Sequence, residues 1–186
     1  MTSDSISFDH SAAIDGLIER SFEAFKPPER LTVSEWAVRH RRLSPEGSAF
    51  TGRFRLETAP YQQEPMEAVN DADVQSVVLM WASQTGKTEV INNVVGFFIC
   101  EEPSPMLILQ PTLDMAETWS KDRLAPMVRD TAVLTDLVAD AKARDSGNTV
   151  LHKRFTGGHV TVAGANSPAS LASRPIRVVL CDEVDR

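Results

Sequence analysis

The residues best suited to chemistry form one short run, Ser83-Gln84-Thr85-Gly86-Lys87-Thr88. The run follows the apolar segment Val77–Met80 and precedes a stretch with helical periodicity, so it predicts a buried strand, a tight loop and a helix. In that order the backbone N–H groups and the helix N-terminus surround phosphates. Lys87 adds a positive charge, and the Thr88 hydroxyl can reach Mg²⁺. A complete phosphate-loop pattern has glycine where Trp81 stands, so this match needs support from a second motif.

A pair of acids near the end of the chain supplies that support. Asp182 and Glu183 follow the apolar run Ile176–Cys181, which begins after Pro175 and predicts a buried parallel strand. Acids at the carboxyl end of such a strand lie at the crevice where α/β sheets bind ligands. Asp182 is then placed to hold Mg²⁺, and Glu183 to polarise the attacking water. A solvated acidic turn explains the pair in isolation, but together with Gly86-Lys87-Thr88 nucleotide hydrolysis is the better interpretation.

Apolar patterns predict further strands and helices around these two motifs. Strands that alternate with helices indicate a parallel α/β core. The predicted fold is therefore α/β, a three-layer P-loop NTPase core with a mainly parallel sheet over residues 60–186, preceded by a helical N-terminal region over residues 1–59. The predicted elements of the core are strands over 77–80, 106–109, 150–155, 159–164 and 176–181 and helices over 88–98, 112–127, 132–143 and 170–172.

The N-terminal region contains two helix signals. Apolar residues recur at helical spacing between residues 14 and 25, and Pro27-Pro28 ends that pattern. Thr32 and Glu35 then have the spacing of a capping box, in which each side chain bonds the other residue's backbone N–H. We expect a second helix to begin at this point.

Composition and charge limit the classes of function. The chain has 186 residues, a net charge of −7, 42% hydrophobic residues and 24% charged residues, which is typical of a soluble globular protein. That net charge argues against a uniformly basic surface for nucleic acid. One basic patch is present, Arg39-His40-Arg41-Arg42 with Arg53 and Arg55 nearby. It is interpreted either as a solvated helix end, where cations favour the helix dipole, or as a contact for DNA phosphate or an acidic partner.

Membrane insertion, a disulfide and a metal centre are not indicated. Apolar stretches such as Val94–Cys100 are too short to span a bilayer, and the N-terminus lacks the pattern of a signal peptide. Cys100 and Cys181 both lie in apolar runs, so we interpret them as reduced core residues of a cytosolic protein. His152 and His159 have no neighbouring set of metal ligands in the sequence.

Tyr61 and Gln62 precede the predicted phosphate loop and form a candidate adenine site. The amide can bond the edge of the base and the aromatic ring can stack on its face. A tyrosine that simply packs against the core is the alternative interpretation.

Several segments taken together resemble the large terminase subunit of tailed phages of the lambda type, the GpA family. The resemblance covers nearly all of the chain, and the segments occur in the family's order. It is carried by Leu31-Thr32-Val33-Ser34-Glu35-Trp36-Ala37, Pro60-Tyr61-Gln62, Ser83-Gln84-Thr85-Gly86-Lys87-Thr88-Glu89, Gln110-Pro111-Thr112, Gly164-Ala165-Asn166-Ser167 and Leu180-Cys181-Asp182-Glu183-Val184-Asp185-Arg186.

The resemblance implies an ATPase, dependent on ATP and Mg²⁺, that powers packaging of double-stranded viral DNA into a procapsid. It places Tyr61 and Gln62 at the adenine, residues 83–88 at the phosphates, and Asp182 and Glu183 at the metal and the water. It also implies the bacterial host cytoplasm, no membrane, and the partners double-stranded DNA, a small terminase subunit, the procapsid portal and further copies of the full-length chain.

Two departures from the family pattern leave alternatives open. Gln84 stands where some relatives carry a basic residue, so the source of an arginine finger is open; Arg174 is a candidate, although a structural salt bridge is the favoured role for it. The sequence reaches only to Arg186, so we expect the sheet to be incomplete at this end and the nuclease part to be absent. The rival interpretations are a helicase-like ATPase of superfamily 2 and a catalytically inactive module that binds a small terminase subunit or DNA.

Overall fold

The computed structural model describes residues 14–18, 21–22, 29–48, 50–138, 147–166 and 175–183. The chain forms two compact units, Met1–Arg30 and Leu31–Arg186. In the first unit, residues 14–18 and 21–22 are helical, as the apolar spacing predicts, and their apolar side chains are exposed. The predicted division at residue 59 stays a prediction.

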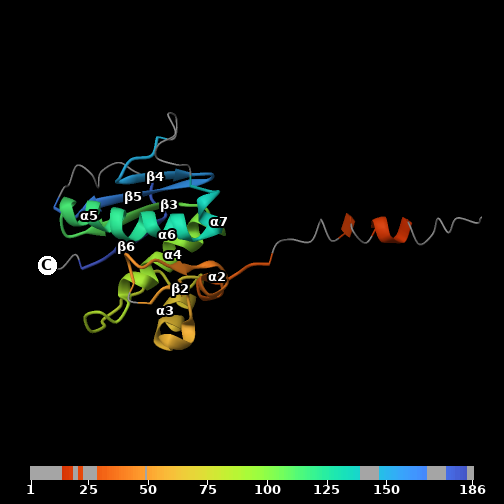
Figure 1. Cartoon of the computed structure of the whole chain (residues 1–186), viewed down its shortest axis with the longest axis horizontal. Helices are drawn as coiled ribbons and strands as arrows, with labels where there is room; N and C mark the ends of the chain where they lie inside the picture. Colours follow the sequence, from red (N-terminus) through yellow and green to blue (C-terminus); the bar gives the residue numbers. More distant parts are fainter. Residues whose placement is uncertain are drawn as a thin grey trace, which may run out of the picture. The chain divides into compact units, whose positions relative to one another are not determined.

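The second unit is built on a four-stranded sheet of order β4-β5-β3-β6 (Figure 1). Its strands are β3 (Pro105–Gln110), β4 (His152–Phe155), β5 (Gly158–Gly164) and β6 (Val178–Cys181). β5 and β6 both run parallel to β3, whereas β4 pairs with β5 in the predicted antiparallel hairpin. The predicted α/β class with a mainly parallel sheet is confirmed.

The predicted strand over Val77–Met80 is wrong. These residues have no regular secondary structure, and Val78 and Met80 are 77% and 91% exposed. An apolar segment becomes a strand only where a neighbouring strand offers backbone partners, because strand preference reflects packing on adjacent strands. β6 is the last strand of the sheet as described, and no strand of the described residues lies beyond it.

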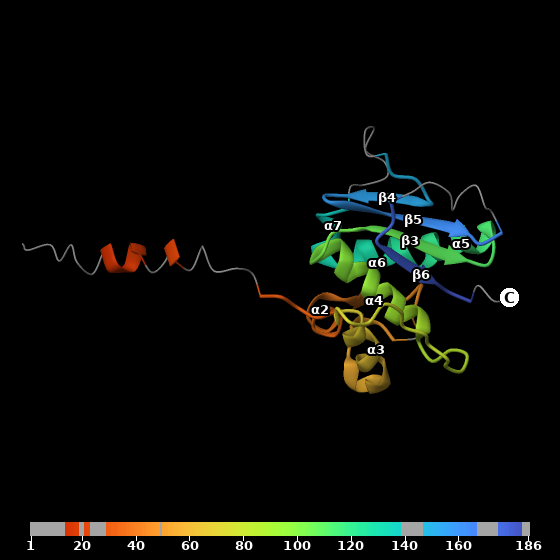
Figure 2. The ribbon, with the colours of Figure 1, turned by 180° about the vertical axis from the view of Figure 1, so that it is seen from behind.

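Helix α4 (Lys87–Cys100) lies at the centre of the core and confirms the predicted helix after the loop. Helix α2 (Val33–His40) packs against it so closely that a Cβ on Gly96 would lie 2.1 Å from the Trp36 ring. The opposite views agree that α5 (Leu113–Trp119) and α6 (Ala125–Asp130) cover one face of the sheet (Figure 2).

The remaining elements are short. The predicted helix over 132–143 is confirmed only as α7 (Ala132–Thr135), and residues 139–143 of it, like the predicted helix 170–172, lie outside the described residues. No helix in the described part of the chain has the length and apolar character needed to cross a membrane. The other short elements are β1 (Arg42–Leu43), β2 (Gly52–Arg53), η1 (Leu56–Thr58), η2 (Pro60–Gln62), α3 (Gln63–Ala68) and the π-helical turn η3 (Ser120–Leu124).

Side-chain caps fix where two helices begin. The Thr32 hydroxyl accepts from the Glu35 N–H and the Glu35 carboxylate accepts from the Thr32 N–H, so the predicted capping box starts α2. The predicted Thr112 cap accepts from the Met115 N–H and starts α5.

Candidate active site

The loop before α4 is shaped by two left-handed residues. Gln84 has φ 59° and Gly86 has φ 88°, and Gly86 is also the N-cap of α4. The positive φ of Gly86 favours glycine, and a Cβ there would also lie 2.3 Å from the Gln62 amide nitrogen. No side chain caps the α4 N-terminus. The first backbone N–H groups of this 14-residue helix therefore stay available for an anion, and the helix dipole favours negative charge there.

The two sequence motifs meet at the first turn of α4. The Thr88 hydroxyl donates to the Asp182 carboxylate over 3.4 Å. Asp182 is held at the carboxyl end of β6, because its N–H donates to the Leu109 carbonyl at the end of β3 over 3.0 Å. A hydroxyl and a carboxylate oxygen are ligands that suit Mg²⁺. The fold thus joins residues far apart in sequence into one oxygen-ligand pair.

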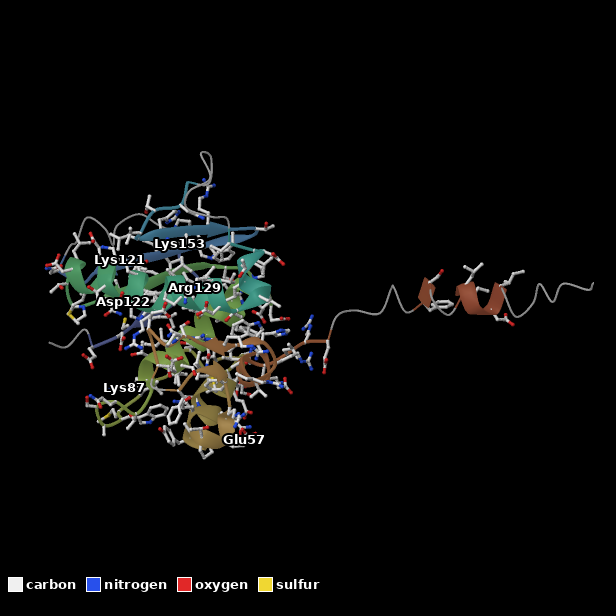
Figure 3. All side chains as sticks on the ribbon, viewed as in Figure 1. Glu57, Lys87, Lys121, Asp122, Arg129 and Lys153 are labelled. Carbon is white, nitrogen blue, oxygen red and sulfur yellow. The ribbon has the colours of Figure 1, made fainter. Side chains whose placement is uncertain are left out.

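Lys87 lies at the same helix end (Figure 3). Its ammonium group donates to the Trp81 carbonyl over 3.2 Å, so the side chain folds back along the loop. The Lys87 side chain is partly exposed. A lysine bound to one loop carbonyl can exchange that acceptor for a phosphate oxygen.

Glu183 follows Asp182 in a left-handed conformation with φ 53°. Non-glycine residues with positive φ are uncommon, and such backbone strain clusters at active sites. The turn places a partly exposed carboxyl group directly after the proposed metal ligand. This is where a carboxylate could contact a water molecule beside the phosphate.

Tyr61 and Gln62 contact the loop itself. The Tyr61 hydroxyl donates to the Thr85 carbonyl over 3.0 Å, and the Gln62 amide lies 3.5 and 3.4 Å from the carbonyls of Thr85 and Gly86. Gln62 is 4% exposed, whereas Tyr61 is 52% exposed. The structure therefore brings both residues to the loop, while their contact with an adenine stays a prediction. Trp81, the departure from the glycine pattern, packs edge-on against the Tyr61 ring at 5.2 Å between centroids.

The first turn of α4 also forms an ion pair that the sequence did not predict. Arg41 is 3% exposed, and its guanidinium lies 3.2 Å from the carboxylate of Glu89, the residue after Thr88. Burial lowers the pKa of Arg41, and the Glu89 charge opposes that shift. The sequence shows only a basic run and a helix acid, with no signal that links them.

Three further predicted site residues lie in the loop before α4, and one candidate lies outside the described residues. The Thr85 hydroxyl donates to the Ala82 carbonyl over 2.8 Å and closes the turn. Ser83 and Gln84 are exposed at the tip of the loop. Arg174, the candidate finger, lies outside the described residues.

Comparison with known proteins identifies the family of this chain. Residues 48–186 match the family model of the phage terminase large subunit gpA, ATPase domain, and the chain belongs to this family. The resemblance inferred from the motifs is confirmed.

Two curated relatives are terminase large subunits. The subunit of Enterobacteria phage P21 is 28% identical over 158 residues, which cover 84% of this chain and 24% of the relative. The subunit of Escherichia phage lambda is 30% identical over 131 residues, which cover 70% of this chain and 20% of the relative. The chain thus spans about a quarter or less of their length. No solved structure matches the chain.

Proposed function

We propose that this chain is a P-loop ATPase module that hydrolyses ATP with Mg²⁺ to drive packaging of double-stranded viral DNA into a procapsid. The observation that carries the proposal is the contact between Thr88 and Asp182 beside an uncapped helix N-terminus. Membership of the terminase ATPase family supports it.

The residues at the first turn of α4 fit Mg²⁺ and the phosphates of ATP. Thr88 and Asp182 would hold the ion, which supplies charge neutralisation at the phosphate oxygens. Lys87 exchanges the Trp81 carbonyl for a phosphate oxygen, and the N–H groups of the loop and of the α4 N-terminus bind the others. Glu183 orients the attacking water and draws its proton.

The proposed core is incomplete beside β6. Val179 of β6 is 54% exposed, and no described strand pairs with the outer edge of β6. Val77–Met80 is also apolar and largely exposed. The residue that follows each segment accepts a hydrogen bond from the first turn of α4: Trp81 from Lys87, and Asp182 from Thr88. A parallel sheet is normally buried on both faces, so both segments favour a further strand between or beside them.

The nuclease, small-subunit and portal functions belong to the proposal for the whole protein. These functions would depend on the parts of the relatives that this chain does not cover. A helicase-like ATPase has no observation that favours it here. The exposed edge of β6 leaves one alternative, a catalytically inactive binding module. ATP turnover by the purified chain would exclude it.

The test is ATP binding and hydrolysis by the purified chain beside Lys87→Ala. We expect the substitution to abolish ATP binding, because the loop loses its only side-chain cation among the described residues 81–89. The control is Lys121→Ala, since Lys121 of η3 forms an exposed ion pair with Glu117 of α5 and does not belong to the loop. Equal ATP affinity in wild type and Lys87→Ala would refute the assignment.

A further inference from the structure

Three arginines share one face of the β1–β2 ribbon. Arg42 of β1 lies directly opposite Arg53 of β2. Arg55 comes two residues after Arg53, and residues two apart in extended chain point the same way. Phe54, between them, points to the opposite side and is 5% exposed in the core. All three arginines are exposed, so one face of the ribbon is basic.

This basic face lacks neutralising partners in the described part of the chain. Like charges directly opposite each other across two strands are destabilising. No described carboxylate forms an ion pair with Arg42, Arg53 or Arg55, and Arg53 donates only to the Val38 carbonyl. Other arginines of the unit do have such partners: Arg129 pairs with Glu46 and Asp130, and Arg177 pairs with Glu102. An anion that binds the ribbon would relieve the repulsion.

We infer that this face of the ribbon, Arg42, Arg53 and Arg55, binds the phosphate backbone of double-stranded DNA. Guanidinium groups match phosphate oxygens in a fork geometry and stay charged at all working pH values. The choice of DNA among polyanions rests on the proposed function. Since the chain as a whole carries a net charge of −7, the contact must be local and sensitive to salt.

The ribbon is attached to the first turn of α4 through Arg41. Arg41, the residue before Arg42, forms the buried ion pair with Glu89 in the first turn of α4. The Arg41 carbonyl also accepts a hydrogen bond from the Phe54 N–H over 3.1 Å. The ribbon is therefore fixed to the helix that begins at the proposed ATP site, and DNA bound there would lie one residue from that attachment.

The test is fluorescence anisotropy of a labelled duplex DNA titrated with the full chain at several salt concentrations. The double variant Arg42→Ala/Arg53→Ala removes the facing pair. We expect it to lower the affinity by roughly tenfold and to make the slope of log K against log salt shallower by about 1.8, because each phosphate contact contributes about 0.9.

The matched control is Lys121→Ala/Arg177→Ala, which removes the same number of positive charges from exposed ion pairs with Glu117 and Glu102. We expect it to leave the slope unchanged. An unchanged slope in the ribbon variant, equal changes in both variants, or no DNA binding by the wild type would each overturn the inference. Binding of the wild type to anionic phospholipid vesicles in preference to the duplex would overturn it as well.

ATP binding measured in the same preparations separates this inference from the proposed function. If the ribbon variant shows a shallower salt dependence of DNA affinity but an unchanged ATP affinity, the result supports DNA binding by the ribbon and shows that the ATP site is intact. A wild type that binds DNA through the ribbon but binds no ATP refutes the proposed function alone. Thermal unfolding of each variant, followed by circular dichroism, checks that the exposed substitutions leave the fold unchanged.

Discussion

Two apolar segments precede the two halves of the candidate site, and only one of them is a strand. β6 pairs with β3 in register from Met106 opposite Val178 to Leu109 opposite Cys181. Val77–Met80 has a similar composition but no regular structure. The difference is the neighbour, because β3 offers β6 a row of backbone partners. An apolar pattern thus specifies a segment that prefers burial, while pairing depends on which strands are present to receive it.

The loop before α4 is accordingly held by side chains more than by a sheet. Tyr61 and Gln62 contact its carbonyls, and Arg41 fixes the next turn through Glu89. At the other half of the site, Asp182 is held by a backbone bond that continues the β6–β3 ladder. One half of the site is therefore positioned by strand pairing and the other by polar contacts to the α2–α3 region.

The largest expected effect concerns the half positioned by the strand. Glu183→Gln keeps the size of the side chain but removes the carboxylate proposed to accept a proton from the attacking water. We expect ATP turnover to fall by about 10²- to 10⁴-fold with ATP affinity retained. Steady-state hydrolysis and equilibrium ATP binding measure the two quantities. Turnover at the wild-type rate would remove Glu183 from the mechanism.

A smaller effect compares the two apolar segments directly. Leu180 of β6 packs against the core, so Leu180→Ala should lower the free energy of unfolding by about 1–2 kcal/mol. Val78 is 77% exposed, so Val78→Ala should change it by less than about 0.5 kcal/mol. Urea unfolding of both variants checks the contrast. Equal losses would mean that Val77–Met80 is packed as firmly as β6.

The sequence predicts well the features that depend on local chemistry. The capping box at Thr32, the cap at Thr112, the helix after Gly86 and the hairpin of β4 and β5 all follow from residue types at fixed spacings. The structure also brings Thr88 to Asp182, the two residues predicted to hold Mg²⁺, although the strand predicted before the Thr88 loop does not form.

Features that depend on distant partners are not predictable in the same way. The failure of Val77–Met80 to form a strand reflects the absence of a described neighbour, which its own residues cannot reveal. The Arg41–Glu89 pair joins two ordinary charged residues through the packing of α2 on α4. Cys181 was expected in the core, but it is exposed because it lies on the last strand of the sheet as described.

The most direct test of the central claim is a double-mutant cycle on Thr88 and Asp182, measured as the Mg²⁺ dependence of ATP affinity. If both residues hold one ion, Thr88→Ala and Asp182→Asn should each remove most of the gain in affinity that Mg²⁺ provides. The double variant should then lose little more, with a coupling of at least about 1 kcal/mol. Losses that simply add, or an affinity that never depended on Mg²⁺, would contradict a shared metal site at the first turn of α4.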